Sequence, residues 1–472
     1  MLGRIEEENE LLAAESSPQS EFVAVYGRRR VGKTYLVQTT FDGRFSFVHT
    51  GIAKAPARVQ LRKFRSSLRQ SGLADCRPLA DWFEAFEELE RFLGTLASSR
   101  KIVFIDEMPW LDTPRSNFVA ALENFWNGWA SRRRDILLIV CGSATSWVIG
   151  KVIRDKGGLH NRVTRQIALK PFTLGECEMF SNVQGLALSR SEIAELYMVL
   201  GGVPWYWSLL RPGRSAAQEI DRLFFSEGAV LAGEFRSLFD SLFRTGSCHA
   251  KIVEALSAKR IGLTRGEIAK ATGIAENGAL TKALEELEQC GFVRAYRAFG
   301  ARKKGMVHQL VDCLSLFHFR FLASGTESAG TEGYWSATIG SGSRRAWSGL
   351  AFELLCLLHL RQIRRALGIG GILCGACSWR SSRDAAQGAQ IDLVLDRADN
   401  IIDLCEMKWS ETPFRMDKAE ADAIVRRKAA FIAETGTRKA VHSVLVASQG
   451  LERGRHSGVV QAVIGLDDLF LW

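Results

Sequence analysis

Apolar residues in the first 150 positions fall into short runs that are hydrophobic on both faces. The runs are EFVAVY (21–26), residues 45–50, KIVFID (101–106) and DILLIVCGSATSW (135–147). Continuous runs of this length, without strict alternation, are typical of strands buried in a parallel sheet. Segments of helical length, such as KTYLVQTTF and FVAALENFWNGWA, separate them. The pattern predicts an α/β domain with a parallel sheet over residues 1–175.

A helical pattern replaces the strands over residues 176–245 and is broken only at GGVPW and RPGR, which predicts a small helical lid. Residues 246–312 predict three helices, at about 249–258, 264–272 and 277–290, and then a β-hairpin with the basic tip Arg302-Lys303-Lys304. Thr264 and Glu267 are spaced as a capping box for the second helix. Three helices followed by a hairpin is the order of a winged helix.

The last part of the chain follows a linker at 313–345, within which 324–343 is rich in Gly and Ser. The segment WSGLAFELLCLLHLRQI (347–363) is apolar nearly all round, which predicts a buried helix. QIDLVLDRADNIIDLCEMKWS (390–410) predicts two strands joined by a turn at DRADN. A further helix at DKAEADAIVRRKAAFIAE and a strand at AVHSVLVAS complete an α/β domain over 346–472.

The stretch GRRRVGKT joins the first strand to the first helix and fits the spacing G-x-x-x-x-G-K-[ST]. In such a loop, backbone N–H groups surround a phosphate chain, which requires the glycines Gly27 and Gly32. Lys33 is expected to reach the β- and γ-phosphates, and Thr34 to place its hydroxyl on Mg²⁺. ATP and Mg²⁺ are therefore the predicted cofactors.

Two further strand ends supply the remaining groups of a nucleotide site. Asp106 ends the third strand and is expected to hold the Mg²⁺ shell, while Glu107 orients and deprotonates the attacking water. Ser143 ends the next strand, where it would sense the γ-phosphate. Arg162 is the first candidate, and Arg165 the second, for a side chain that stabilises transition-state charge on a neighbouring subunit. That role predicts a homo-oligomer.

The arginines of the loop leave alternatives open. Their side chains are expected to point outward, where they add positive field for ATP or contact a neighbouring domain or nucleic acid. The residues predicted to contact the nucleotide are Gly27, Arg28, Arg29, Arg30, Val31, Gly32, Lys33, Thr34, Tyr35, Asp106 and Ser143.

Carboxylates and a lysine gather on the C-terminal hairpin. If Leu395 pairs with Ile401, Asp392 lies diagonally beside Glu406, and Lys408 shares the face of Glu406 because strand side chains alternate. Such a group can hold Mg²⁺ and activate water against a phosphodiester.

With Glu353 on the preceding helix as a further metal ligand, this Asp…Glu-x-Lys pattern resembles the PD-(D/E)xK nuclease superfamily. The resemblance implies a restriction-endonuclease-like α/β domain. Two alternatives are a salt-bridged surface hairpin and a nuclease-like fold without activity.

Several segments together resemble the archaeal-type ATPase family of the AAA+/STAND P-loop NTPases. The resemblance implies ATP hydrolysis on an α/β sheet with a helical lid, often with a winged helix and a nuclease-like domain. Arg4 matches the N-terminal box of that family, and Gly202 and Pro204 match its lid motif. The segments are LGRIEEENELLA, VYGRRRVGKTYL, IVFIDEMPWL, CGSATSW, RVTRQIALKPFTLGE and LGGVPWYW.

Composition narrows the class of protein. The chain of 472 residues carries a net charge of +10, which favours an anionic partner, DNA first. No apolar run reaches the roughly 20 residues of a membrane span, so a cytoplasmic protein without a membrane partner is expected.

The resulting prediction is an ATPase coupled to nucleic-acid binding, with Mg²⁺-dependent DNA cleavage as a second activity. The alternative is an ATP-regulated switch or transcription regulator with an inactive nuclease-like domain. Whether the winged helix contacts DNA or only links domains stays open, because its third helix is rich in glutamate.

Overall fold

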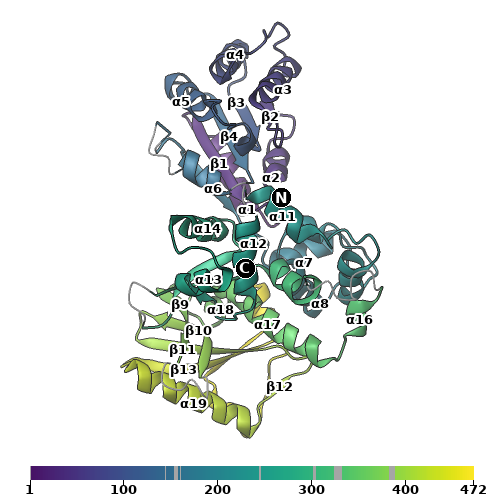
Figure 1. Cartoon of the computed structure of the whole chain (residues 1–472), viewed down its shortest axis with the longest axis vertical. Coiled ribbons are helices and arrows are strands. Elements are labelled where there is room, and N and C mark those ends of the chain that lie inside the picture. The colour runs from purple at the N-terminus through teal and green to yellow at the C-terminus, as the bar shows by residue number, and fades with distance from the viewer. Residues whose placement is uncertain are drawn as a thin grey trace. The chain divides into compact units, whose positions relative to one another are not determined.

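The computed structural model describes residues 2–143, 145–153, 158–159, 161–243, 246–300, 305–323, 332–381 and 389–471. The chain divides into two compact units, Met1–Pro171 and Phe172–Trp472, whose elements are labelled in Figure 1. No helix in the described part of the chain is both long enough and apolar enough to cross a lipid bilayer.

A five-stranded parallel sheet forms the centre of the first unit, as the apolar runs predict. Its strand order is β2-β3-β4-β1-β5, so the carboxyl ends of β1, β3 and β4 lie along the same edge. The fifth strand, at the sheet margin, was not predicted. The strands are β1 (Glu21–Gly27), β2 (Phe45–Thr50), β3 (Lys101–Asp106), β4 (Ile136–Gly142) and β5 (Arg165–Leu169).

Helices cover both faces of this sheet with separate apolar clusters. One cluster contains Leu11, Leu36 and Val37 from α1 and α2. The other joins the aromatic residues of α3, α4 and α5 to the opposite face, with Trp82 and Phe118 in edge-to-face contact at 4.9 Å. The helices are α1 (Ile5–Glu15), α2 (Lys33–Thr40), α3 (Ala57–Gln70), α4 (Trp82–Thr95), α5 (Phe118–Gly128) and α6 (Thr145–Val148).

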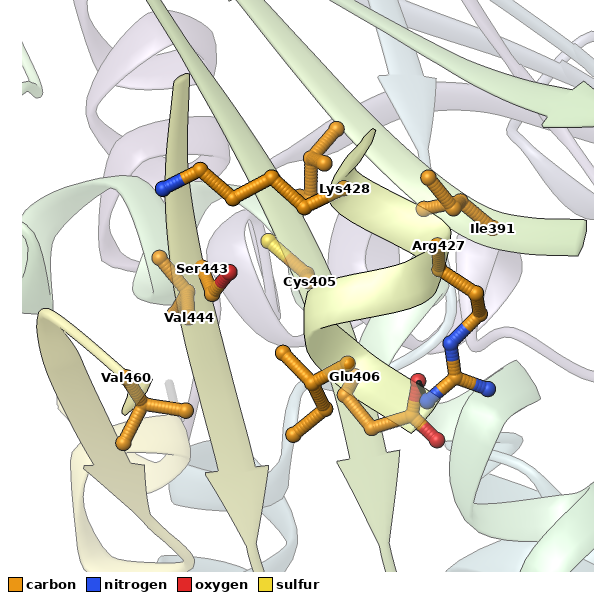
Figure 2. Close-up of a pocket in the computed structure, with 10 residues that line it drawn as sticks. Ile391, Cys405, Glu406, Arg427, Lys428, Ser443, Val444 and Val460 are labelled. Carbon is orange, nitrogen blue, oxygen red and sulfur yellow. Dashed lines mark ion pairs between the residues drawn. The ribbon is translucent and has the colours of Figure 1, made fainter. Parts of the chain in front are cut away.

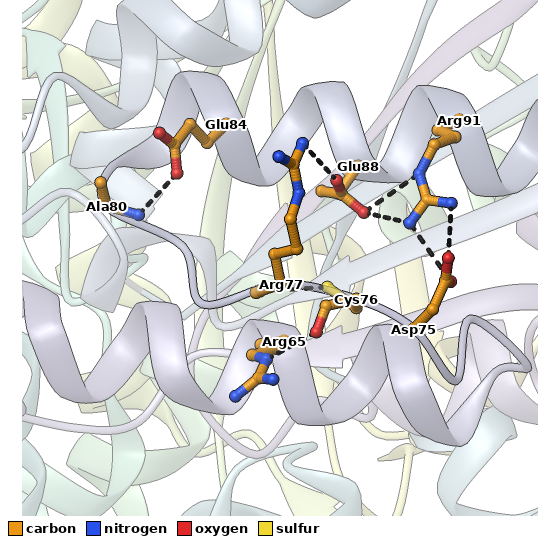
Figure 3. A network of polar contacts seen from close by, with 8 residues as sticks. All are labelled: Arg65, Asp75, Cys76, Arg77, Ala80, Glu84, Glu88 and Arg91. Atoms are coloured by element: carbon orange, nitrogen blue, oxygen red, sulfur yellow. Dashed lines mark hydrogen bonds and ion pairs between the residues drawn. The ribbon is translucent and has the colours of Figure 1, made fainter.

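A polar network joins α4 to the loop after α3 (Figure 3). Arg91 lies 2.6 Å from Glu88 and 3.2 Å from Asp75, and Arg77 approaches Glu88 from the loop at 3.7 Å. Because Arg91, Asp75 and Arg77 are largely exposed, solvent screens these pairs and each adds little stability. The network orients a surface loop rather than building a site.

The second unit begins with the helices expected over 176–245. They surround Gly202, where an added Cβ would lie 1.8 Å from the carbonyl oxygen of Phe172. Only glycine therefore allows the two backbones to meet, and Phe172 donates a hydrogen bond to Gly202 at 2.6 Å. The helices are α7 (Leu174–Val183), α8 (Arg190–Leu200), α9 (Pro204–Trp207), α10 (Ala216–Ile220) and α11 (Glu234–Leu242).

Three helices and a hairpin follow, close to the predicted positions. They are α12 (Gly246–Ser257), α13 (Arg265–Thr272) and α14 (Gly278–Gln289), with β7 (Val293–Arg297) antiparallel to β8 (Met306–Leu310). Thr264 and Glu267 form the predicted capping box. A two-residue strand, β6 (Leu263–Thr264), was not predicted and pairs with β8. The basic tip Arg302-Lys303-Lys304 lies outside the described residues.

The C-terminal part contains another five-stranded sheet, in the order β15-β13-β11-β10-β9. Unlike the first sheet it is mixed, with parallel and antiparallel pairs of strands. Helix α17 packs on one face, where Phe352 and Leu355 join Cys405 and Met407 in one cluster. Helix α19 covers the other face through Phe431. The elements are α15 (Cys313–Phe317), α16 (Tyr334–Ala337), α17 (Gly342–Leu358), α18 (Leu360–Ala366), β9 (Cys374–Arg380), β10 (Gln390–Arg397), β11 (Ile401–Lys408), β12 (Phe414–Arg415), α19 (Lys418–Thr435), β13 (Ala440–Ala447), β14 (Leu451–Glu452) and β15 (Ala462–Gly465).

The helix predicted over 347–363 is wrong in one respect, because His359 divides it into α17 and α18. His359 is fully buried, and its Nε2 accepts a hydrogen bond from the backbone N–H of Leu174 at 3.0 Å. Its Nδ1 lies 2.8 Å from the carbonyl oxygen of Leu355 and donates to it in the tautomer that this pairing requires. The helix is interrupted where the His359 side chain hydrogen-bonds to two backbone groups. The spacing of apolar residues along the chain could not predict this interruption.

We predict that His359 makes the protein sensitive to mild acid. Burial lowers the pKa of His359 from 6.5 to about 4. The stability that neutral imidazole provides is therefore complete above pH 6.5 and is lost as the pH falls towards 4, by at most about 1.4 kcal/mol per pH unit. His359→Gln should show a flatter fall of the thermal unfolding midpoint between pH 7 and pH 5 than the wild type.

The matched control is His456→Gln, at a partly exposed position, which should keep the wild-type slope. Equal slopes for wild type and His359→Gln would contradict the prediction.

Candidate functional sites

The loop after β1 has the backbone that phosphate binding needs. Gly27 has a φ of +146°, and a Cβ there would lie 2.2 Å from the carbonyl oxygen of Leu169. Gly32 has a φ of +89° and is the N-cap of α2. Both positions demand glycine, so the loop brings backbone N–H groups to the start of α2, where the helix dipole also favours an anion.

Two side chains at the start of α2 connect the loop to the neighbouring strand. Lys33 is buried, and its ammonium donates to the carbonyl oxygens of Gly27 (2.9 Å) and Arg28 (2.8 Å). The hydroxyl of Thr34 donates to Oδ2 of Asp106 at 2.8 Å. The cation and the candidate metal ligands of the loop thus lie together.

This donor set fits Mg²⁺ bound with a nucleotide. Mg²⁺ usually takes one or two protein oxygens and completes its shell with water and substrate phosphates. Thr34 and Asp106 would hold it, and the metal would neutralise charge on the phosphates. Within the described residues there is no group of three or more His, Cys, Asp or Glu that could hold a metal by itself.

Glu107 and Ser143, predicted separately, are in contact. The hydroxyl of Ser143 donates to Oε1 of Glu107 at 2.7 Å. Glu107 takes a left-handed conformation, with φ of +47°, and its N–H donates to Oδ1 of Asp106 at 2.8 Å. This turn directs two adjacent carboxylates to different partners, one to Thr34 and one to Ser143.

The other predicted loop residues lie in different surroundings. Arg28 is 7% exposed, so the expectation of an outward side chain is wrong for it, whereas Arg29 and Arg30 are partly exposed. Val31 belongs to the core beside α2. Tyr35 is 63% exposed.

The two candidate finger arginines differ in their contacts. Arg162 is exposed. Arg165 lies on β5 and pairs with Glu10 at 2.6 Å and Glu21 at 3.7 Å. Arg162 is therefore the more exposed of the two candidates.

Arg4 is a further residue of this site, to which the sequence assigned a family match but no role. It is buried, and its guanidinium donates to the carbonyl oxygens of Lys170 (2.6 Å) and Val31 (3.4 Å). Arg4 thereby connects the phosphate loop to the end of β5. A buried guanidinium in this position acts on the loop backbone, so its effect on nucleotide would be indirect.

The second predicted site lies on β10 and β11, with a register two residues from the expected one. Leu395 faces Asp403, not Ile401, and Val394 faces Leu404. Continuing this register by one step beyond Leu393 and Cys405 places Asp392 opposite Glu406. The shift is an even number, so each side chain keeps its predicted face.

A β-bulge determines where Asp392 points. Relative to β9, the pairing of β10 gains one residue between Ile391 and Val394. Ile391 packs in the cluster beneath α19, whereas Leu393 packs in the cluster of α17. Bulges of this kind redirect a side chain next to functional sites, and nothing in the hairpin's alternation predicted it.

The residues predicted for this site line one cavity of about 470 Å³, together with three residues that were not predicted for it. The predicted residues are Glu353, Asp392, Glu406 and Lys408, and the others are Arg260, Gln390 and Arg427. Arg260, from the turn before β6, lies 2.5 Å from Asp392 and also contacts Glu353. Gln390 donates to Oδ1 of Asp392 at 2.6 Å. Sequence reasoning missed Arg260 and Gln390, although both are polar residues next to predicted elements.

Glu406 has its own basic partners. Lys408 lies 3.3 Å from Glu406 and 3.3 Å from Glu420. Arg427 reaches Glu406 from α19 at 3.0 Å, and Figure 2 shows its side chain extending towards that carboxylate. Arg427 thus lines the cavity.

Glu353 is the perturbed acid of this cavity. Burial in α17 and the charge of Asp392 raise the pKa of Glu353 to about 8, while Arg260 opposes the rise. Glu353 and Asp392 both contact the guanidinium of Arg260. Their oxygen atoms therefore point to the same place, which is an arrangement that fits a divalent cation.

Comparison with known protein families gives a match to the first part of the chain. Residues 2–210 match the family of ATPase domains predominantly from Archaea. The first part of the chain is therefore similar to these ATPase domains, and its sheet is the parallel α/β sheet described above. The match covers less than half of the chain and does not extend to the second site.

More distant relatives span more of the chain. An uncharacterized protein of Methanocaldococcus jannaschii is 22% identical over 86% of this chain and 88% of its own. A Walker-type ATPase of Pyrococcus abyssi is 17% identical, with a TM-score of 0.48 over 68% of this chain and 96% of its own. The ORC2 protein of Aeropyrum pernix is 16% identical, with a TM-score of 0.42 over 72% and 96%.

We predict that Arg4→Lys weakens ATP binding about tenfold, because lysine keeps the charge but lacks the fork that reaches two carbonyl oxygens. Fluorescent-nucleotide titration of the full chain measures this. Arg58→Lys, at an exposed position on α3, should bind as the wild type does. Wild-type affinity in Arg4→Lys would remove Arg4 from the site.

Proposed function

We propose that the protein is a Mg-ATP-hydrolysing P-loop ATPase coupled to nucleic-acid binding and metal-dependent DNA cleavage. The observation that supports the ATPase most strongly is the contact between Thr34 and Asp106 at 2.8 Å. It joins the phosphate loop to the acidic end of β3, as a shared metal shell would require.

The roles of the other residues follow from their positions. Loop N–H groups and Lys33 bind the β- and γ-phosphates once the ammonium leaves the carbonyl oxygens that it now contacts. Glu107 takes the proton of the attacking water, and Ser143 holds Glu107 in place until the γ-phosphate competes for the hydroxyl. The exposed Arg162 stabilises transition-state charge on the γ-phosphate bound by a neighbouring copy of the chain. This role requires the active form to be a homo-oligomer.

The C-terminal site is assigned phosphodiester hydrolysis. Glu353 and Asp392 would provide oxygen ligands for Mg²⁺, Glu406 would join them once it leaves Arg427 and Lys408, and Lys408 would stabilise charge on the phosphate. Residues 246–312 form a winged helix in this proposal. The net charge of +10 supports DNA as the partner.

A second candidate function is an ATP-regulated switch or transcription regulator with an inactive nuclease-like domain. Each of the three acids in the cavity has a basic partner, as the contacts of Arg260, Arg427 and Lys408 show. That neutralisation favours the switch if no cation can displace these side chains.

We predict that Lys33→Ala lowers ATP turnover about 100-fold or more, because it removes the cation that stabilises charge on the transferred phosphate. Phosphate release by the full chain measures this. The matched control is Lys63→Ala, at an exposed position on α3, which should keep full turnover. Turnover at the wild-type rate in Lys33→Ala would refute the ATPase site.

We predict that Asp392→Asn stops Mg²⁺-dependent cleavage of DNA while ATP turnover stays unchanged, because it removes one charged metal ligand. Asp396→Asn is the control, since Asp396 lies on the same strand but pairs with Lys439 at 2.6 Å. Cleavage that survives in Asp392→Asn, or that never occurs in the wild type, would leave the switch as the better assignment.

A further inference from the structure

The turn between α12 and β6 places a guanidinium between two carboxylates of the C-terminal site. Nη2 of Arg260 lies 2.5 Å from Oδ2 of Asp392 and also contacts Oε1 of Glu353. Both acids therefore meet at a single nitrogen atom. Oxygen ligands surround divalent cations at about 2.0–2.6 Å, so this nitrogen stands where the two acids would hold a metal.

The backbone of the turn is tied to β8. The carbonyl oxygen of Arg260 accepts a hydrogen bond from Gln309 Nε2 at 2.6 Å. Gly262 has a φ of +87°, and a Cβ there would lie 2.1 Å from the carbonyl oxygen of His308. The backbone position of Arg260 is therefore set by β8 of the β7–β8 hairpin rather than by the acids that its side chain contacts.

The same hairpin is joined to the C-terminal sheet. The hydroxyl of Tyr296 donates to the carbonyl oxygen of Ile261 at 2.5 Å and lies 2.7 Å from Ser378 Oγ on β9. The N–H of Phe299 donates to the carbonyl oxygen of Ser378 at 2.9 Å, and its ring contacts Phe431 of α19 at 4.9 Å. The segment carrying Arg260 is thus part of the wall of the site.

The acids of the cavity form ion pairs with different basic residues. Glu406 pairs with Arg427 and Lys408. Among the described contacts, Arg260 is the cation paired with Glu353 and Asp392. Its side chain is 47% exposed, so it can leave the acids without unfolding the turn.

We propose that Arg260 is a latch that occupies the metal position of the C-terminal site until a phosphodiester backbone draws it away. The inference rests on the nuclease function proposed above. Guanidinium binds phosphate oxygens in pairs and strongly, so an entering strand offers Arg260 a second partner. Its departure frees the carboxyl oxygen atoms of Glu353 and Asp392, which a divalent cation can then contact. Metal and nucleic acid then bind cooperatively, each tightening the other.

The test uses the full chain and Mn²⁺, followed by electron paramagnetic resonance. Arg260→Gln should bind Mn²⁺ about tenfold more tightly than the wild type without DNA, because a competing charge has been removed. Lys259→Gln removes the adjacent exposed charge and should behave as the wild type. Duplex phosphorothioate DNA should tighten Mn²⁺ binding to the wild type but not to Arg260→Gln. Arg260→Lys, which keeps a charge, should lie between them.

The gained Mn²⁺ site should disappear in Arg260→Gln combined with Asp392→Asn. Equal Mn²⁺ affinity in wild type and Arg260→Gln, with circular dichroism showing both folded, would overturn the latch. Loss of Mn²⁺ binding in Arg260→Gln would also overturn it. Tighter Mn²⁺ binding without DNA cleavage by either protein would support the latch and refute the proposed nuclease activity.

Discussion

The hydrogen bond between Thr34 and Asp106 depends on a parallel sheet. These residues are 72 positions apart and their side chains meet at 2.8 Å. They do so because β1 and β3 flank β4 in parallel, so that the loop after one strand and the acid at the end of the other reach the same edge. Parallel strands in open α/β sheets commonly present ligand sites at their carboxyl ends. Strand order, rather than either motif alone, brings Thr34 and Asp106 together.

Positive charge plays a different part in each unit. In the phosphate loop, Lys33 contacts neutral carbonyl oxygens, so exchanging them for phosphate brings the ammonium a charged partner. In the C-terminal cavity, Arg260 already contacts two carboxylates. Releasing it requires another anion of comparable strength. The cation of the first unit thus contacts neutral groups, whereas the cation of the C-terminal cavity contacts charged ones.

Much of the fold could be read from local rules. Apolar runs predicted β1 to β4, and capping chemistry predicted the start of α13 at Thr264. Strand alternation predicted the shared face of Glu406 and Lys408, which line one cavity with Asp392, even though the assumed register was wrong by two. The predictions that failed did so because they depend on contacts with distant segments of the chain. His359 breaks a helix through contact with Leu174, and the bulge near Asp392 arises in pairing with β9.

The sequence by itself determined the phosphate loop, the acidic strand end and the Asp…Glu-x-Lys hairpin, because each depends on spacing along a few residues of one or two adjacent elements. The tertiary structure alone decided that Arg4 supports the loop, that Ser143 contacts Glu107 and that Arg260 lies between Glu353 and Asp392. Those contacts join segments distant in the chain. Which residues meet in these contacts depends on how the sheets and helices pack. The pattern of apolar residues within one segment does not predict it.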